Sequence, residues 1–205
     1  MRGKFITFEG SEGSGKSTQA KLCCSYLRSK KKSVLHIREP GGVKISEQIR
    51  RILLNVKNTK MSKECETLLY MAARAQLVKE IIAPALAKGK IVICDRFLDS
   101  TVAYQGYGCG VSVKAIKKIG RFATLGLKPH LTFVFDIKTK EGLSRTGRIK
   151  DRIERRSLDY HNRVRRGYLN MARLEPRRIK IIKVDGTKKE IRQIVQNHLK
   201  RSLGL

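Results

Sequence analysis

The chain has 205 residues, 40% of them hydrophobic, and a formal net charge of +29. This length predicts a single domain over residues 1–205. Because the sequence has no long apolar run and no room for a signal peptide before the first strand, we expect a soluble cytoplasmic protein without membrane contacts. The five cysteines form no C-x-x-C pair, which argues against a zinc site or a disulfide framework.

Segments with strand and helix patterns alternate along the chain. Short apolar runs, rich in β-branched and aromatic residues, predict strands at 5–8, 34–37, 91–94, 131–136 and 180–184. Helical patterns predict helices at 15–30, 45–54, 63–88, 100–105, 113–125, 140–146, 151–174 and 188–203. This alternation indicates an α/β fold, a five-stranded parallel sheet flanked by helices, with ligand sites at the carboxyl ends of the strands.

Two of the predicted helices have a clear apolar face. In the helix at 45–54 this face is formed by Ile45, Ile49, Ile52 and Leu53. In the long helix at 63–88, the apolar positions that recur near a 3.6-residue period are Leu68, Leu69, Ala72, Ala75, Ile81 and Ile82. Pro84 is expected to kink or divide this long helix, and Gly89 to cap its end.

A phosphate-binding loop follows the first predicted strand. The stretch Gly10-Ser11-Glu12-Gly13-Ser14-Gly15-Lys16-Ser17, with Thr18 after it, matches the P-loop pattern G-x-x-x-x-G-K-[ST]. The glycines let backbone N–H groups turn toward phosphate oxygens, and the following helix adds the positive end of its dipole. Lys16 would reach the β- and γ-phosphates of a nucleotide, and the Ser17 hydroxyl would bind Mg²⁺. The alternative is an ordinary glycine turn with a chance lysine.

Charged residues at the ends of the predicted strands suggest a second phosphate site. Asp95 ends an apolar strand, where an acid can bind Mg²⁺ directly or through water; its alternative role is to cap the next helix. Arg38 and Arg96 also lie at strand ends, and Arg74 joins them as a third candidate. Since the arginine fork suits phosphate oxygens, the three side chains together could bind a second phosphate ester.

Five stretches resemble bacterial thymidylate kinases, in order and over essentially the whole chain. They are the P-loop at 10–18, Arg38-Glu39-Pro40-Gly41-Gly42, residues 72–76, residues 95–106, and residues 151–168 with Asp151-Arg152-Ile153-Glu154 at their start. The resemblance implies a P-loop NTPase three-layer sandwich, transfer of the γ-phosphate of ATP to dTMP giving dTDP and ADP, Mg²⁺ as cofactor, and a homodimer.

The resemblance also implies roles for single residues. Lys16 and the P-loop amides at 10–18 would hold ATP, with Ser17, Asp95 and Glu12 near Mg²⁺. Glu12 would lie close to both substrates, with Arg96 between the donor and acceptor phosphates. The other residues implied to contact dTMP are Arg38, Glu39, Pro40, Tyr70, Arg74, Ser100, Tyr104 and Gln105, with Tyr70 stacked on thymine.

The arginine-rich stretch at about 142–154 resembles the lid that closes over ATP in this family. The variable P-loop positions, Ser11 to Ser14, include no basic residue, which agrees with the bacterial form whose lid supplies the catalytic arginine. The candidates are Arg145, Arg148 and Arg152, and closure of the lid would exclude water. The alternative is a solvated helix face, which leaves Gly147 unexplained.

Other functions stay open at this point. The near alternatives are another nucleoside monophosphate kinase, or a deoxynucleoside kinase in which Glu39 would be the base. A more distant one is a basic P-loop ATPase that binds nucleic acid. Because the cations are spread along the chain, we interpret them as a basic surface to which any nucleic-acid binding is incidental; the charge of +29 has no explanation in the sequence.

Overall fold

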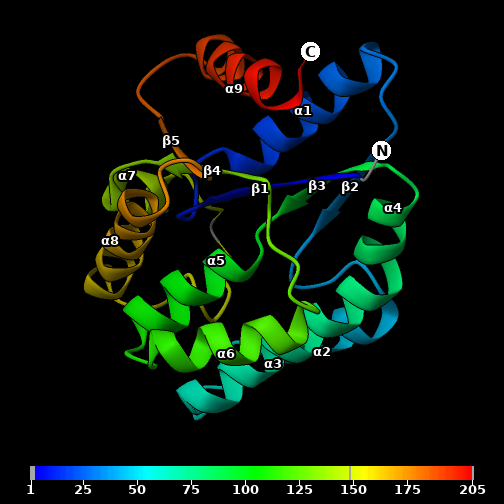
Figure 1. Ribbon diagram of the computed structural model, residues 1–205. Helices are drawn as coiled ribbons and strands as arrows, with labels where there is room; N and C mark the ends of the chain where they lie inside the picture. Colours follow the sequence, from blue (N-terminus) through cyan, green and yellow to red (C-terminus); the bar gives the residue numbers. More distant parts are fainter. Residues whose placement is uncertain (1–2, 148, 205) are drawn as a thin grey trace.

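The computed structural model describes residues 3–147 and 149–204. Its centre is a parallel sheet of five strands in the order β2-β3-β1-β4-β5 (Figure 1). The strands are β1 (Lys4–Gly10), β2 (Val34–Arg38), β3 (Ile91–Asp95), β4 (Leu131–Asp136) and β5 (Ile179–Lys183). The predicted α/β class and the five predicted strands are confirmed.

Helices cover both faces of the sheet (Figure 1). They are α1 (Lys16–Ser29), α2 (Lys44–Leu54), α3 (Lys63–Leu77), α4 (Ala83–Ala87), α5 (Leu98–Thr101), α6 (Val113–Ala123), α7 (Thr139–Ser144), α8 (Leu158–Leu174) and α9 (Lys188–Leu203). Two π-helical segments, Val78–Ile82 and Val102–Gly108, join α3 to α4 and follow α5. Helices α1 and α9 lie together on one face, while α3, α6 and α8 lie on the other.

The position of β1 explains why the site forms beside it. Ile6 and Phe8 of β1 pack with α1 and α9, whereas Phe5 packs into the core on the opposite face. All three side chains have no exposed surface, as expected for a strand at the centre of a parallel sheet. Because β1 pairs with β3 and β4, the loops after these strands meet at one edge of the sheet.

Two helix boundaries differ from the sequence prediction. Helix α8 begins at Leu158 and not at 151, because the hydroxyl of Ser157 accepts the backbone N–H of Tyr160 and caps the helix there. The long helix at 63–88 neither stops nor breaks at Pro84: a π-helical turn at 78–82 precedes the proline. Gly89 ends it with φ +74°, as predicted.

The apolar faces of α2 and of the predicted helix at 63–88 are buried only in part: Leu53 and Ile82 have no exposed surface, whereas other members face outward. Ile45 and Ile52 on α2 are 49% and 47% exposed, and Leu68 on α3 is 54% exposed. Helix α3 instead buries a face that carries polar side chains, including Glu66 and Arg74. The inward face of α3 therefore lies against a polar cavity. Within the part of the chain that the structure describes, no helix has the length and apolarity needed to span a bilayer.

Candidate active site

The P-loop connects β1 to α1 at the carboxyl edge of the sheet. Its backbone turns through positive φ angles at Gly10, Gly13 and Gly15, of 139°, 66° and 77°. A Cβ added at Gly15 would meet no atom within 4 Å, so the loop opens onto free space in front of the helix N-terminus. The buried hydroxyl oxygen of Ser14 has no hydrogen-bond partner among the described residues. These features fit a cradle for phosphate oxygens.

A cluster of charges links the P-loop to the end of β3. Nη2 of Arg96 donates to both carboxylate oxygens of Glu12 at 2.9 Å, and the hydroxyl of Tyr104 donates to Glu12 at 2.7 Å. Nζ of Lys16 lies 3.9 Å from the same carboxylate. Burial alone would raise the pKa of Glu12, but Arg96, Lys16 and Tyr104 hold it down at about 2. Glu12 is therefore an anion that holds two cations at the mouth of the P-loop.

The backbone of Arg96 adopts a conformation that is uncommon for a side chain with a Cβ. Its φ is 69°, in the left-handed region. The turn is held because its N–H donates to the carbonyl of Phe8 at 2.9 Å and the next N–H, of Phe97, donates to Oε1 of Glu9 at 2.7 Å. In this turn Nη1 of Arg96 reaches the carbonyl of Gly10 at 3.0 Å. The strained turn thus points the guanidinium at the P-loop.

Glu9 is a functional candidate that the sequence reasoning missed. It is completely buried, and its Oε2 accepts the hydroxyls of Ser100 at 2.5 Å and Tyr168 at 3.0 Å. Burial and the nearby Asp99 raise the pKa of Glu9 to about 8. The one signal in the sequence is an acid in an otherwise apolar strand, immediately before the P-loop.

The raised pKa of Glu9 predicts how stability depends on pH. The folded protein keeps this proton up to about pH 8, whereas the unfolded chain releases it near 4.5. The free energy of unfolding should therefore fall as the pH rises between these values, by up to about 1.4 kcal/mol per pH unit. Urea unfolding of the wild type and of Glu9→Gln at pH 5, 6, 7 and 8 measures the effect. Glu9→Gln should flatten the slope; identical slopes would contradict this titration.

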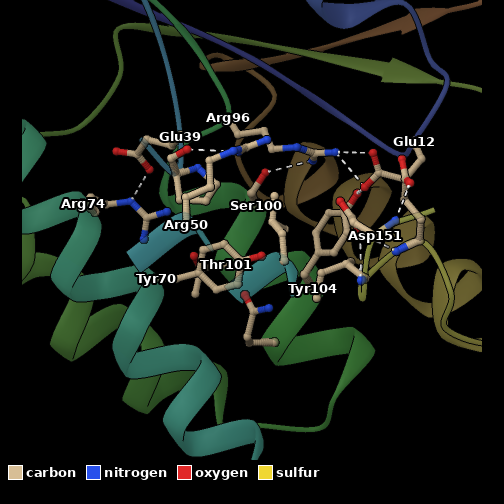
Figure 2. A pocket seen from close by; sticks show the side chains of 15 residues that line it. Glu12, Glu39, Arg50, Tyr70, Arg74, Arg96, Ser100, Thr101, Tyr104 and Asp151 are labelled. Atoms are coloured by element: carbon tan, nitrogen blue, oxygen red, sulfur yellow. Dashed lines mark hydrogen bonds and ion pairs between the residues drawn. The ribbon is translucent and has the colours of Figure 1, made fainter. Parts of the chain in front are cut away.

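A cavity of about 200 Å³ adjoins the charge cluster (Figure 2). Arg96 reaches along it toward Glu12, and Tyr70 and Thr101 lie beneath Arg96 in this view. Its lining comes from α2, α3, the α5 region and residues 151–154. The lining residues are Glu12, Glu39, Pro40, Arg50, Leu54, Tyr70, Arg74, Arg96, Ser100, Thr101, Tyr104, Gln105, Asp151, Ile153 and Glu154.

A buried ion pair forms one wall of this cavity. Nε of Arg74 donates to Oε2 of Glu39 at 2.7 Å, and its Nη2 donates to the carbonyl of Phe97 at 3.1 Å. The other carboxylate oxygen of Glu39 is buried without a partner. Burial raises the pKa of Glu39 to about 7 although Arg74 opposes the shift. The N–H of Phe97 donates to Glu9 and its carbonyl accepts from Arg74, so the backbone of one residue connects Glu9 and Arg74.

Ser17 and Asp95 lie together, as predicted for a magnesium site. The hydroxyl of Ser17 donates to Oδ2 of Asp95, whereas Oδ1 of Asp95 is buried and has no partner. A hydroxyl and a carboxylate are the oxygen ligands that Mg²⁺ prefers, and Mg²⁺ usually takes its remaining ligands from water and phosphate. Among the described residues no group of three or more His, Cys, Asp or Glu could hold a metal, which fits such a sparse site.

Comparisons with known proteins agree with this geometry. A sequence model of the family described as "Thymidylate kinase" matches residues 8–195. The thymidylate kinase of Symbiobacterium thermophilum is 48% identical over 202 residues, covering 96% of this chain and 94% of that protein. That of Kosmotoga olearia is 49% identical over 185 residues, covering 89% and 88%. The chain belongs to the thymidylate kinase family.

A solved structure supports the same assignment. The crystal structure of thymidylate kinase from Ehrlichia chaffeensis superposes with a TM-score of 0.81 at 32% identity, covering 98% of this chain and 99% of that one. As a thymidylate kinase, the chain is a nucleoside monophosphate kinase that binds ATP and phosphorylates dTMP. The family typically uses Mg-ATP.

The structure brings most of the predicted site residues together around the P-loop and the cavity. Arg38 is an exception: its Nη2 bonds Glu47 at 2.9 and 3.1 Å, its Nη1 donates to the carbonyl of Pro40 at 2.8 Å, and it does not line the cavity. Gln105 lines the cavity but directs its amide N–H₂ to Glu66 at 2.8 Å. Arg50, which sequence reasoning missed, lines the cavity and donates to Pro40 at 3.0 Å.

The predicted lid arginines have different surroundings. Arg145 pairs with Glu141 at 2.6 Å on the surface. Arg152 points away from the P-loop: it pairs with the buried Glu66 at 2.6 Å and donates to the carbonyl of Leu53 at 2.8 Å. Arg148 lies outside the described residues. In this arrangement neither Arg145 nor Arg152 contacts the P-loop charges.

Proposed function

We propose that this thymidylate kinase holds ATP on the P-loop and dTMP in the adjoining cavity, with Arg96 between the two phosphates. The observation that carries the proposal is the position of Arg96, which contacts Gly10 and Glu12 of the P-loop and also lines the cavity. Phosphoryl transfer depends on alignment and on neutralising charge. The acceptor phosphate is already an anion, so Arg96 and Lys16 need only bring two anions together.

On the donor side, the amides and side chains of residues 10–18 would hold the ATP phosphates. The buried position of Lys16 supports this role, because the residue is 8% exposed and its ammonium lies 3.4 Å from the Ser11 carbonyl of the loop. Mg²⁺ would be held by Ser17 and Asp95, with Glu12 nearby, and would supply further positive charge to the phosphates. The unpartnered Oδ1 of Asp95 supports this donor set.

On the acceptor side, Arg74 and Arg96 would hold the dTMP phosphate, and the remaining wall would surround the base and sugar. Tyr70 offers an aromatic face for stacking on thymine, while Ser100, Tyr104 and Gln105 form the floor. Glu39 and Pro40 would position Arg74 and Arg50. Arg38 would act from outside the cavity, through its bond to the Pro40 carbonyl.

An acceptor panel tests the proposed reaction. A coupled ADP-release assay with dTMP, dUMP, CMP and thymidine should give the highest kcat/KM with dTMP. Glu39 is committed to Arg74, so we expect no base for a 5′-hydroxyl and no activity on thymidine. Activity on thymidine without activity on dTMP would contradict the proposal. Since the reaction consumes ATP and dTMP, we place the enzyme in the cytoplasm.

We propose that residues 142–154 act as a lid within a single kinase domain over 1–205, and that the lid supplies the arginine missing from the P-loop. Three observations support this. Gly142 packs closely on the P-loop: a Cβ at Gly13 would lie 2.0 Å from the Gly142 carbonyl oxygen, and a Cβ at Gly142 would lie 2.4 Å from that of Glu12. Arg145 and Arg152 follow on that segment, and residues 151–154 already wall the cavity. To reach ATP, Arg152 would have to leave Glu66.

Removal of lid arginines should lower kcat more than it raises the KM for dTMP. We expect at least one of Arg145→Ala, Arg148→Ala and Arg152→Ala to reduce kcat by at least about 10-fold, because a donated arginine stabilises charge in the transition state. Arg155→Ala is the matched control: this exposed arginine directly follows the proposed lid, and its side chain donates to the Lys150 carbonyl. If all three variants keep the kcat of the control, the lid does not supply the arginine.

We also propose that the enzyme is a homodimer that pairs through α2, α3 and α6. These helices are neighbours on one side of the molecule (Figure 1). Their exposed apolar side chains are Ile45, Ile52, Leu68 and, on α6, Phe122, which is 84% exposed. Such a group of large apolar side chains is typical of a surface covered by a partner.

A charge placed on this surface should separate the subunits. We expect Phe122→Glu to sediment as a monomer at a concentration where the wild type sediments as a dimer, because the carboxylate would be buried without a partner. Ile194→Glu on α9 is the control, since Ile194 is 44% exposed on the opposite layer. A monomeric wild type, or an unchanged Phe122→Glu dimer, would contradict the proposed interface. Analytical ultracentrifugation distinguishes these outcomes.

A further inference from the structure

The layer formed by α1 and α9 carries an excess of positive charge that the kinase reaction does not use. Helix α1 and the three residues after it, together with α9, expose ten lysine and arginine side chains. Against these stands one carboxylate, Glu190, in the first turn of α9. The ten cations are Lys21, Arg28, Lys30, Lys31, Lys32, Lys188, Lys189, Arg192, Lys200 and Arg201.

None of these ten side chains has a carboxylate partner among the described residues. The ion pairs of the described residues lie elsewhere. Three of them join Lys16, Arg74 and Arg96 to acids of the site. The remaining pairs involve residues in or next to α2, the lid region, α8 and β5. Arg74 and Arg96 of the site are thus neutralised within the protein, whereas the cations of the α1–α9 layer face solvent. Their charge is available to an external anion.

The two helices present these cations as one surface. Gln19 on α1 donates to the carbonyl of Lys188 at 3.1 Å, so the N-terminal ends of the helices lie together. Both helices then pack along the same face of the sheet (Figure 1). Ile191, Val195 and Leu199 of α9 face the core. The exposed Lys189 and Lys200, eleven residues apart, lie on the same outward side of the helix.

We propose that the α1–α9 layer binds the phosphate backbone of a nucleic-acid duplex without reading its sequence. Helix α9 has 16 residues and is about 24 Å long, which corresponds to about 14 phosphates of duplex DNA. The ten exposed cations match this number in order of magnitude. Backbone binding of this kind needs spaced Lys and Arg side chains and no base contacts.

An anionic membrane would be the other extended partner for a basic surface, and the layer fits it less well. Membrane-surface helices place large apolar or aromatic side chains beside their cations. Of the side chains that the structure describes on α1 and α9, Ile194 is the only large apolar one exposed. The exposed Phe122 and Leu68 are on the opposite layer. The composition of the surface therefore favours nucleic acid.

Charge reversal on this layer, against a control of equal net charge, tests the proposal. The test variant is Lys21→Glu, Arg28→Glu, Lys200→Glu. The control is Lys79→Glu, Lys88→Glu, Arg173→Glu, which reverses three exposed and unpaired cations on other faces of the described chain. Fluorescence anisotropy with a labelled 24-base-pair DNA duplex measures affinity between 50 and 200 mM KCl, and dTMP kinase activity reports that each variant is folded.

The wild type should lose at least about 10³-fold in affinity over this salt range. The test variant should bind at least about 30-fold more weakly than the wild type at 100 mM KCl and show a shallower salt dependence, while the control stays within about 3-fold and both keep wild-type kcat. Equal losses in both variants would mean that only the overall charge attracts DNA. Tighter binding to vesicles with anionic lipid than to DNA, or a loss of kcat/KM for ATP without a loss of DNA binding, would also overturn the proposal.

Discussion

Arg96→Ala should lower kcat for dTMP phosphorylation by at least about 100-fold, as expected when a positioned charge is removed from a transition state. Among the cations of the described site, the Arg96 guanidinium alone both contacts the P-loop and lines the cavity proposed for the acceptor. Its loss would leave Glu12 with Lys16 at 3.9 Å as the remaining cation beside it. Two anionic substrates would then meet beside an insufficiently neutralised carboxylate.

The lysine variant separates charge from geometry at this position. Arg96→Lys keeps one positive charge but cannot make both bonds to Glu12 and the bond to Gly10, so we expect it to recover only a small part of the lost rate. Steady-state kinetics with dTMP and ATP varied independently give kcat and both KM values, and circular dichroism verifies folding. Near-normal turnover in Arg96→Ala would remove Arg96 from the reaction centre.

How far the sequence predicts the site depends on how local each feature is. The P-loop is a contiguous motif with its own backbone geometry, so Lys16 and Ser17 could be assigned directly. The pairing of Arg96 with Glu12 joins residues 84 positions apart, and the burial of Glu9 requires Ser100 and Tyr168 to converge on it. No local pattern carries that information. The position at a strand end indicated Arg96 and the resemblance to a family supplied Tyr104, but neither supplied Glu9 or Arg50.

The errors in the fold have a common physical origin. An amphipathic pattern shows that a helix has an apolar face, but not what that face contacts. The apolar stripes on these helices are typical of core packing. Leu53 is buried as expected, yet Ile45 and Leu68 are exposed, and the core side of α3 carries Glu66 and Arg74 as well as apolar side chains. Likewise the start of α8 was decided by the cap at Ser157, which outweighs the helical character of residues 151–156. Packing around the cavity, and not the local sequence pattern, therefore decides which face of α3 is buried.

Lys16→Ala should also reduce kcat by at least about 100-fold, through the donor phosphate. Lys16 is 8% exposed, and its ammonium lies 3.4 Å from the carbonyl of Ser11, within the glycine-rich loop. Burial and the nearby Arg96 lower its pKa, while Glu12, Asp95 and Glu9 oppose the shift. An arriving γ-phosphate would favour the charged form, so the interaction strengthens where negative charge accumulates.

Because Lys16 is enclosed, a larger cation should not replace it. We expect Lys16→Arg to be nearly as slow as Lys16→Ala, since a planar guanidinium spreads its charge over a fork and cannot place a compact ammonium at the position that Lys16 occupies. Lys21→Ala is the control: the next lysine along α1 is exposed, away from the loop. Single-turnover measurements with bound Mg-ATP separate chemistry from binding. A variant of Lys16 that binds ATP more weakly but transfers phosphate at the normal rate would confine the lysine to binding, and would leave Arg96 and the lid to stabilise the transition state.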